Sequence, residues 1–165
     1  MARDTSKTLQ ERVATSHVKP LGVDLDAMAA ISNIFRVATL FRKTAERQIL
    51  SKHQLSFSGF TVLWVLWVWG EKQSYDLAEE CGIAKGTLTG IVSTLEKRGL
   101  VDSKPHPSDG RRKFIFLKDS GLSMIESLFL EINQLEVRVT STLNGTEKPE
   151  LSRMLRILLH NMEDS

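Results

Sequence analysis

Apolar residues recur at intervals of three and four along most of the chain, and this spacing predicts a mainly helical protein. The first apolar stripe predicts a long helix from Leu25 to Leu50. The next helix is apolar almost all round and ends at Gly70, so it should be buried on more than one side. Either Ser56 or Ser58 can cap its N-terminus.

The remaining apolar stripes predict four more helices. The expected helices are 75–81, capped by Ser74; 85–98, ending at Gly99; a long helix from Ser120 that closes at Asn144-Gly145; and a last helix capped by Thr146. Between the second and third of these the period changes from near 3.6 to 2. Two short strands, 100–101 and 114–117, are therefore expected, joined by the turn-rich segment 105–110 as a β-hairpin.

The bulk composition is that of one globular unit. The chain has 165 residues, of which 41% are hydrophobic, enough for one well-buried core. Residues 1–23 are expected to form an N-terminal arm, either loose or a short peripheral helix, ahead of a single folded unit over 24–162. The lone Cys81 excludes an internal disulfide, and the N-terminal segment lacks the apolar stretch of a secretory signal. A cytoplasmic protein with no membrane span, cofactor or metal is expected.

Charge is concentrated in one segment. Residues 84–118 contain eight Lys or Arg against three acids, whereas the whole chain carries only +2. A local basic surface on a nearly neutral protein suits a polyanionic partner, because neutralised phosphates release condensed counterions. The same excess of basic residues can also belong to an ordinary charged surface that contacts only solvent.

The segment around residues 77–91 fits a helix-turn-helix. Two helices that cross at a fixed angle need apolar residues at set positions, a small residue at the contact and a glycine in the turn. Ala78 is the small contact residue and Gly82 supplies the turn. The apolar set is Leu77, Cys81, Ile83, Leu88 and Ile91.

The second helix of this motif has a small, hydroxylic outward face. Such a face lets a helix lie in the DNA major groove, where bulky side chains would hold it away from the bases and phosphates. A solvent-exposed face usually carries more Glu and Lys. The expected DNA-binding residues here are Lys85, Gly86, Thr87, Thr89, Gly90, Ser93 and Lys97.

The hairpin offers a second DNA contact through its tip and return strand. A narrow minor groove attracts an inserted Arg or Lys, and either Arg111 or Arg112 can play that part. Asp109 either orients Arg111 or closes the turn. The residues expected to bind DNA here are His106, Asp109, Arg111, Arg112 and Lys113, although His106 is equally well explained as an exposed turn residue.

These motifs resemble the multiple-antibiotic-resistance regulator (MarR) family. The family's Leu-Glu-x-x-Gly-Leu-Val phrase is matched at 95–101, and its Asp-x-Arg wing signature is matched at 109–111. Gly110 stands where the family often has Arg, Lys118 where it usually has Thr, and Ala84 where it usually has a capping Ser. The resemblance implies a winged helix-turn-helix DNA-binding lobe over 56–118 and a helical dimerisation region formed by the N- and C-terminal helices, 24–55 and 120–162.

The resemblance also implies the partners. A homodimer would place two recognition helices in successive major grooves, so double-stranded DNA with an inverted-repeat operator is expected. Release by a small aromatic or phenolic effector is common in such regulators. A candidate effector pocket consists of Phe57, Trp64 and Trp67, with Arg36 or His53 to bind an acidic group. An aromatic-rich helix, however, more often belongs to the protein core.

Three other functions are alternatives to a ligand-responsive repressor. A winged helix that binds protein instead of DNA would need an acidic or apolar recognition face. A redox-responsive regulator would use Cys81, which fits better as a small interior residue. An enzyme would need a catalytic motif, and the scattered histidines and missing glycine-rich signatures indicate none.

Overall fold

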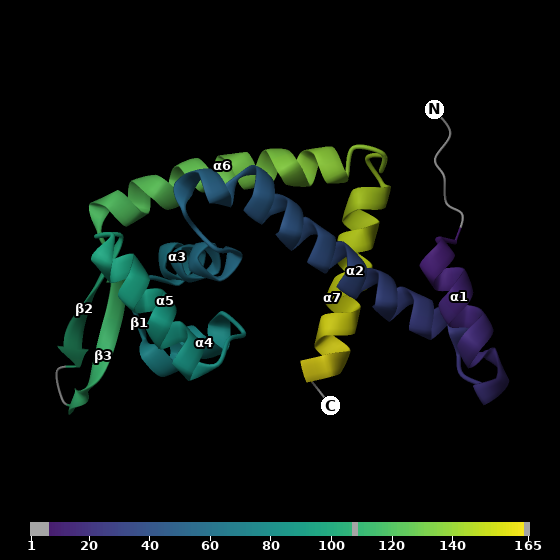
Figure 1. Ribbon diagram of the computed structural model, residues 1–165, viewed down its shortest axis with the longest axis horizontal. Helices are drawn as coiled ribbons and strands as arrows, with labels where there is room; N and C mark the ends of the chain where they lie inside the picture. Colours follow the sequence, from purple (N-terminus) through teal and green to yellow (C-terminus); the bar gives the residue numbers. More distant parts are fainter. Residues whose placement is uncertain (1–6, 107–108, 164–165) are drawn as a thin grey trace. The chain divides into compact units, whose positions relative to one another are not determined.

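The computed structural model describes residues 7–106 and 109–163, without the side chains of 106 and 109–111. The described chain is mainly helical with one small antiparallel sheet (Figure 1). The elements are α1 (Leu9–Val18), the short 3-10 helix η1 (Lys19–Leu21), α2 (Leu25–Gln48), η2 (Leu50–His53), α3 (Phe57–Trp69), β1 (Lys72–Gln73), α4 (Ser74–Glu80), α5 (Lys85–Lys97), β2 (Val101–His106), β3 (Asp109–Leu117), α6 (Asp119–Val139) and α7 (Glu147–Glu163).

Side-chain caps fix several of the helix starts. Ser56 caps α3 by accepting a hydrogen bond from the Gly59 N–H at 3.1 Å, which decides between the two serines considered. The predicted cap at Thr146 is wrong: Asn144 accepts from the Glu147 N–H at 3.0 Å, and the Glu147 carboxylate accepts in return from the Asn144 N–H. Ser74 is likewise the first residue of α4 and forms no cap bond.

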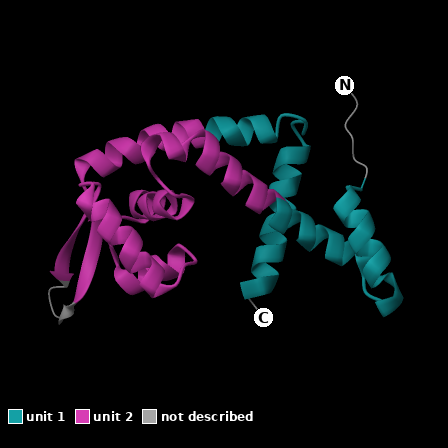
Figure 2. Ribbon diagram, in the orientation of Figure 1, with its two compact units in different colours: residues 1–36, 133–165 teal, residues 37–132 magenta. Residues whose placement is uncertain are grey.

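The described chain divides into two compact units, coloured separately in Figure 2. Unit 2 covers residues 37–132 and contains η2, α3, the sheet, α4 and α5, with parts of α2 and α6. Unit 1 covers 1–36 and 133–165 and contains α1, η1 and α7 with the remaining parts of α2 and α6. Both long helices thus contribute to both units.

The core belongs to unit 2. Helix α3 runs through it and buries Val62, Leu63 and Val65 almost completely, as its uniformly apolar sequence predicts. Leu128 of α6 and Leu50 of η2 are fully covered as well. Among the described residues, every buried apolar side chain except Leu135 lies in unit 2.

The sheet has three strands in the order β1-β3-β2. The two strands of the hairpin are longer than predicted and pair from Val101↔Leu117 to His106↔Asp109, with an irregularity at the tip. Strand β1 was not predicted, because two residues are too few to show an alternating pattern. It pairs with the inner end of the hairpin, Lys72 opposite Ile115, and so ties the hairpin to the start of α4.

One glycine fixes how α6 begins. A Cβ atom on Gly121 would lie 2.0 Å from the Leu100 carbonyl oxygen, so only glycine allows this approach. The Ser120 hydroxyl donates to the Gly99 carbonyl and the Lys118 N–H to the Leu100 carbonyl. The start of α6 is therefore tied directly to the segment that follows α5.

Unit 1 is open by comparison. Helix α1 contacts α2 through its polar side: the Glu11 carboxylate accepts from Asn33 at 3.0 Å, and Arg36 donates to the Thr8 hydroxyl at 2.9 Å. The hydrogen bonds from Asn33 and Thr8, with the charge of Arg36, lower the pKa of Glu11 to about 2. The apolar Leu9 and Val13 of α1 stay 68% and 60% exposed. None of the described helices combines the length and apolarity that a membrane span requires.

Candidate nucleic-acid interface

Helices α4 and α5 form the predicted helix-turn-helix. Leu77 and Ala78 are buried at their contact, as expected of a small residue beside an apolar one. Gly82 has φ 62°, and its N–H donates to the Glu79 carbonyl, which closes α4. Ala84 stands at the N-cap of α5 and forms no side-chain cap bond there, which the sequence had indicated.

Helix α5 has one buried and one open side. Leu88, Val92 and Leu95 face the core and are at most 8% exposed. Of the residues predicted to bind DNA on this helix, six are exposed and Ser93 is half-buried. The exposed six are Lys85, Gly86, Thr87, Thr89, Gly90 and Lys97.

The two glycines of α5 are not explained by packing inside the chain. A Cβ atom on Gly86 or Gly90 would meet no other atom within 4 Å, and neither glycine has a positive φ. Glycine inside a helix costs about 0.5 to 1 kcal/mol relative to alanine. Packing among the described residues therefore does not require glycine at either position.

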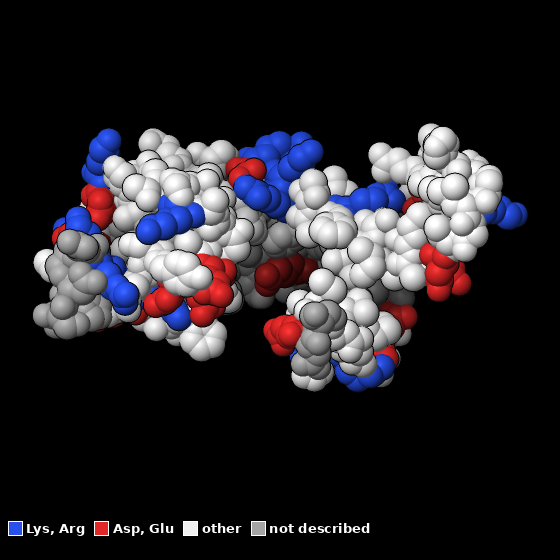
Figure 3. All heavy atoms as spheres, turned by 90° about the horizontal axis from the view of Figure 1, so that it is seen from below, with Lys and Arg blue, Asp and Glu red and all other residues white. Residues whose placement is uncertain are grey.

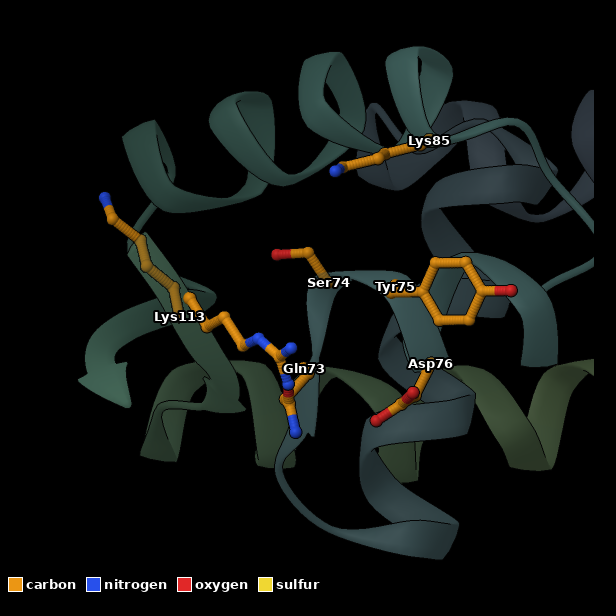
Figure 4. Close-up of a pocket in the computed structure, with 7 residues that line it drawn as sticks. Gln73, Ser74, Tyr75, Asp76, Lys85 and Lys113 are labelled. Carbon is orange, nitrogen blue, oxygen red and sulfur yellow. The ribbon is translucent and has the colours of Figure 1, made fainter. Parts of the chain in front are cut away.

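A groove runs beside the start of α5 and has a volume of about 480 Å³. It is lined by residues of the β1–α4 segment, α5 and β3: Gln73, Ser74, Tyr75, Asp76, Lys85, Arg112 and Lys113. Figure 4 shows the Ser74 hydroxyl and the Lys85 ammonium pointing into the same space, while the Tyr75 ring points away from it. Three cations and one carboxylate give this wing groove a net positive charge, which suits an anion such as a DNA phosphate.

The hairpin, or wing, carries the second set of predicted contacts. Arg112 and Lys113 are exposed on β3. Figure 3 shows basic and acidic side chains interspersed at this end of unit 2. The side chains of His106, Asp109 and Arg111 lie outside the described residues. Lys104 on β2 is engaged elsewhere, because its ammonium pairs with Glu71 at 2.5 Å and lies over the Phe116 ring.

The residues predicted to hold an effector are distributed over both units. Arg36 lies in unit 1, where it binds Thr8 and faces Glu11 at 3.7 Å. His53 lies in unit 2, with Nε2 3.2 Å from the Glu131 carboxylate. The predicted aromatic residues are all on α3: Phe57 packs on Phe60, Trp67 packs on Phe129, and Trp64 is 36% exposed.

Cys81 is half-buried at the end of α4, slightly more open than its motif position predicts. Desolvation, with a smaller contribution from Glu80, raises the pKa of its thiol to about 11. The thiol is therefore protonated at neutral pH and a poor nucleophile. Among the described residues, no three His, Cys, Asp or Glu side chains come together as metal ligands.

The sequence reasoning missed two sets of residues. Gln73 and Ser74 line the wing groove only because β1 pairs with β3, a pairing that a two-residue strand does not reveal in advance. Arg98 is one of the basic residues of 84–118 and ends the helix predicted over 85–98, but the sequence does not predict that its guanidinium reaches a turn 44 residues away. Neither position carries a local signal in the sequence.

A positively charged wing beside an open, hydroxylic recognition helix defines a winged helix-turn-helix DNA-binding protein. The sequence model of the MarR family matches residues 55–113. The chain is also 30% identical over 156 residues to the uncharacterized HTH-type transcriptional regulator YwaE of Bacillus subtilis, covering 93% of this chain and 91% of YwaE. The chain belongs to the MarR family of transcriptional regulators.

A second relative and two solved structures are also similar to this chain. The HTH-type transcriptional repressor IacR of Pseudomonas putida is 31% identical over 78% of this chain and 76% of its own length. The Streptomyces coelicolor regulator Sco3205, solved in complex with DNA, superposes with a TM-score of 0.74 at 21% identity, over 84% of this chain and 89% of its own. NadR, solved with 4-hydroxyphenylacetate, has a TM-score of 0.65 at 25% identity, over 76% of this chain and 89% of NadR.

Proposed function

We propose that this chain is a homodimeric repressor that binds an inverted-repeat operator and is released by a small aromatic or phenolic effector. The observation that carries the DNA-binding part is the outer face of α5, where a Cβ atom added at Gly86 or Gly90 would meet no described atom within 4 Å. A helix without side chains at these positions can approach the floor of the major groove closely. The repressor assignment is supported by the similarity to IacR.

Each predicted residue has a part in this mode of binding. Thr87, Thr89 and Ser93 donate to bases or phosphates, while Lys85 and Lys97 supply charge. The Thr89 hydroxyl donates to the Lys85 carbonyl at 3.0 Å, so it accepts readily but must break this bond to donate. The wing groove receives a backbone phosphate between Lys85, Ser74 and Lys113.

The wing reaches the neighbouring minor groove. Either Arg111 or Arg112 enters it, with Lys113 on the flanking phosphates and His106 on the sugar-phosphate backbone. Asp109 either orients Arg111 or closes the turn. Together the two contacts fix the register of the protein on the duplex.

Dimer formation follows from the open apolar surface of unit 1. In α7, Met154, Leu158 and Met162 lie on one side of the helix and are between 37% and 77% exposed. Phe35 of α2 is 69% exposed. Apolar surface on this scale is rare on a monomer and typical of an obligate interface, so a second copy of the chain is the partner that covers it.

The effector part of the proposal is supported by the exposed aromatic surface of α3 and by the resemblance to NadR, whose ligand is an aromatic acid. Trp64, Trp67 and Phe57 would contact the ring of such a compound, and Arg36 or His53 its acidic group. Release requires the effector to bind more tightly to a form of the dimer that fits DNA poorly.

Gly90→Ala tests the DNA-binding part directly. The added methyl group should stabilise the fold by about 0.5 to 1 kcal/mol, because glycine is a poor helix former. It should also weaken DNA binding about tenfold, because it holds α5 away from the base edges. Binding is measured by fluorescence anisotropy on a duplex that the wild-type protein selects from random DNA, with unrelated DNA as competitor.

Ser152→Ala is the matched control, because it raises the helix propensity of an exposed position in α7, outside the proposed DNA interface. It should leave affinity unchanged. Unaltered affinity for Gly90→Ala would show that α5 does not enter the groove. If the wild-type protein selects no sequence and competitor removes all binding, sequence-specific DNA binding itself is wrong and a protein partner becomes the better hypothesis.

A further inference from the structure

One arginine joins the C-terminal end of the recognition helix to a distant turn. Arg98 follows α5, and its two terminal nitrogens donate to the carbonyl oxygens of Gln54 and His53, both at 2.8 Å. These two acceptors end the η2 turn, which connects α2 to α3. The side chain is half-buried, so water competes only partly for these bonds.

The turn needs a charged donor of this shape. Gln54 has φ 51° and is the only described residue other than glycine with a positive φ. The last carbonyls of a helical turn lack partners inside it and lie at the negative end of its dipole. A guanidinium supplies a permanent positive charge and two parallel N–H groups at once, which an ammonium does not.

The other side of the turn is attached to α6. Nε2 of His53 lies 3.2 Å from Oε1 of Glu131, and both side chains are about one third exposed. A continuous series of polar contacts therefore runs from Glu131 on α6 through the His53 turn to Arg98 at the end of α5. Its members come from three places that are 33 to 78 residues apart in sequence.

A groove of about 280 Å³ lies between α5 and the start of α3. Polar residues on both walls line it together with the apolar Leu55, Ile91 and Leu95. Arg98 and Gln54 line this groove as well, so the bonds of Arg98 join α5 to the η2 turn across it.

We propose that Arg98 is a positioning residue for DNA recognition, which sets the orientation of α5, and that His53 and Glu131 hold the turn on which Arg98 acts. The proposal rests on the proposed function of α5. It assigns Arg98 no contact with DNA. A small rotation of a recognition helix misplaces several base contacts together, so loss of these bonds lowers specific affinity more than non-specific affinity.

Arg98→Lys is the main test, because lysine keeps the charge and loses the paired geometry. Specific binding should weaken about tenfold, the effect of losing one charge-assisted hydrogen bond. Non-specific binding and the salt dependence of affinity should stay as in the wild type. Glu131→Gln should also weaken specific binding, by a smaller factor. It provides a second test of the proposal if Arg98→Lys folds poorly.

Arg42→Lys is the matched control. Arg42 lies near the same segment, with its guanidinium 3.4 Å from the Ser58 hydroxyl, but it does not reach α5. It should leave DNA affinity unchanged. Each variant is measured by anisotropy on the selected duplex and on unrelated DNA at several salt concentrations, together with its thermal unfolding.

The outcomes separate the possible roles of Arg98. A lower melting temperature with unchanged affinity of the folded protein would mean that Arg98 only stabilises the fold, and the proposal fails. A salt dependence shallower by about one unit of slope in the charge-removing variant Arg98→Gln would mean that Arg98 contacts a phosphate itself, which also overturns it. Absence of specific binding by the wild-type protein would instead contradict the proposed function.

Discussion

The two units of this molecule contain similar apolar residues and use them differently. In unit 2, α3 and its neighbours bury Val62, Leu63 and Leu128 completely. In unit 1, α7 has an equally regular apolar stripe, yet none of its described residues is buried. The difference shows that an amphipathic pattern predicts an apolar surface that must be buried. The pattern does not distinguish burial within the same chain from burial against another chain.

This contrast assigns different tasks to the units. A unit with its own core can hold α5 and the wing rigidly, which a DNA-binding surface requires. In the proposed homodimer, a unit without one depends on the second copy, so its stability should vary with dimer formation. Variants in unit 2 should therefore act at any protein concentration, and variants in unit 1 should act through association.

The largest effect is expected in unit 2, for Gly121→Val. The added side chain would collide with the Leu100 carbonyl, where even a Cβ atom lies 2.0 Å away. Unfolding free energy should fall by about 3 kcal/mol or more, because the backbone of α6 must move. Gly145→Ala is the control, since its Cβ meets nothing within 4 Å. Equal thermal unfolding of both variants would contradict the close approach described here.

An intermediate effect is expected in unit 1, for Leu158→Asp. A carboxylate in the apolar stripe of α7 should convert the dimer to a monomer by sedimentation analysis, because burying an unpaired charge costs several kcal/mol. Arg156→Asp places the same group on the other side of α7 and should leave the dimer intact. If Leu158→Asp remains a dimer, unit 1 is not the interface and the comparison between the units fails.

The smallest effect concerns how α1 is held within unit 1. The folded-state pKa of Glu11 is about 2, below its ordinary 4.5. The stabilisation that the ionised Glu11 carboxylate gives to the folded state is therefore complete above pH 4.5, and it is lost as the pH falls from 4.5 toward 2. The protection of the α1 amides from hydrogen exchange, taken relative to the intrinsic exchange rate at each pH, should fall over that range in the wild type, while Glu11→Gln should remove this loss of protection. Equal pH dependence in both would show that another group titrates.

Much of the DNA-binding lobe could be predicted from the sequence because its signals are local. Gly82 and Gly99 both adopt the positive φ that ends a helix. Of the apolar set, Leu77 and Leu88 are buried as the spacing predicts, while Cys81, Ile83 and Ile91 are half-buried. The predicted contact residues on α5 lie on its outer side for the same reason. Capping was predicted less well, since Thr146 and Asn144 are both good caps and the choice depends on backbone geometry.

The sequence alone determined the helices, the hairpin, the helix-turn-helix and the family, because each depends on residues within a few turns of one another. The tertiary structure decided which distant segments meet. It brought Ser74 and Lys113 to one groove through the pairing of β1 with β3, and it brought Arg98 to the carbonyls of the η2 turn. It also showed that no described atom lies within 4 Å of a Cβ atom added at Gly86 or Gly90. Such contacts depend on how separate elements pack, and periodicity within one element carries no information about its partner.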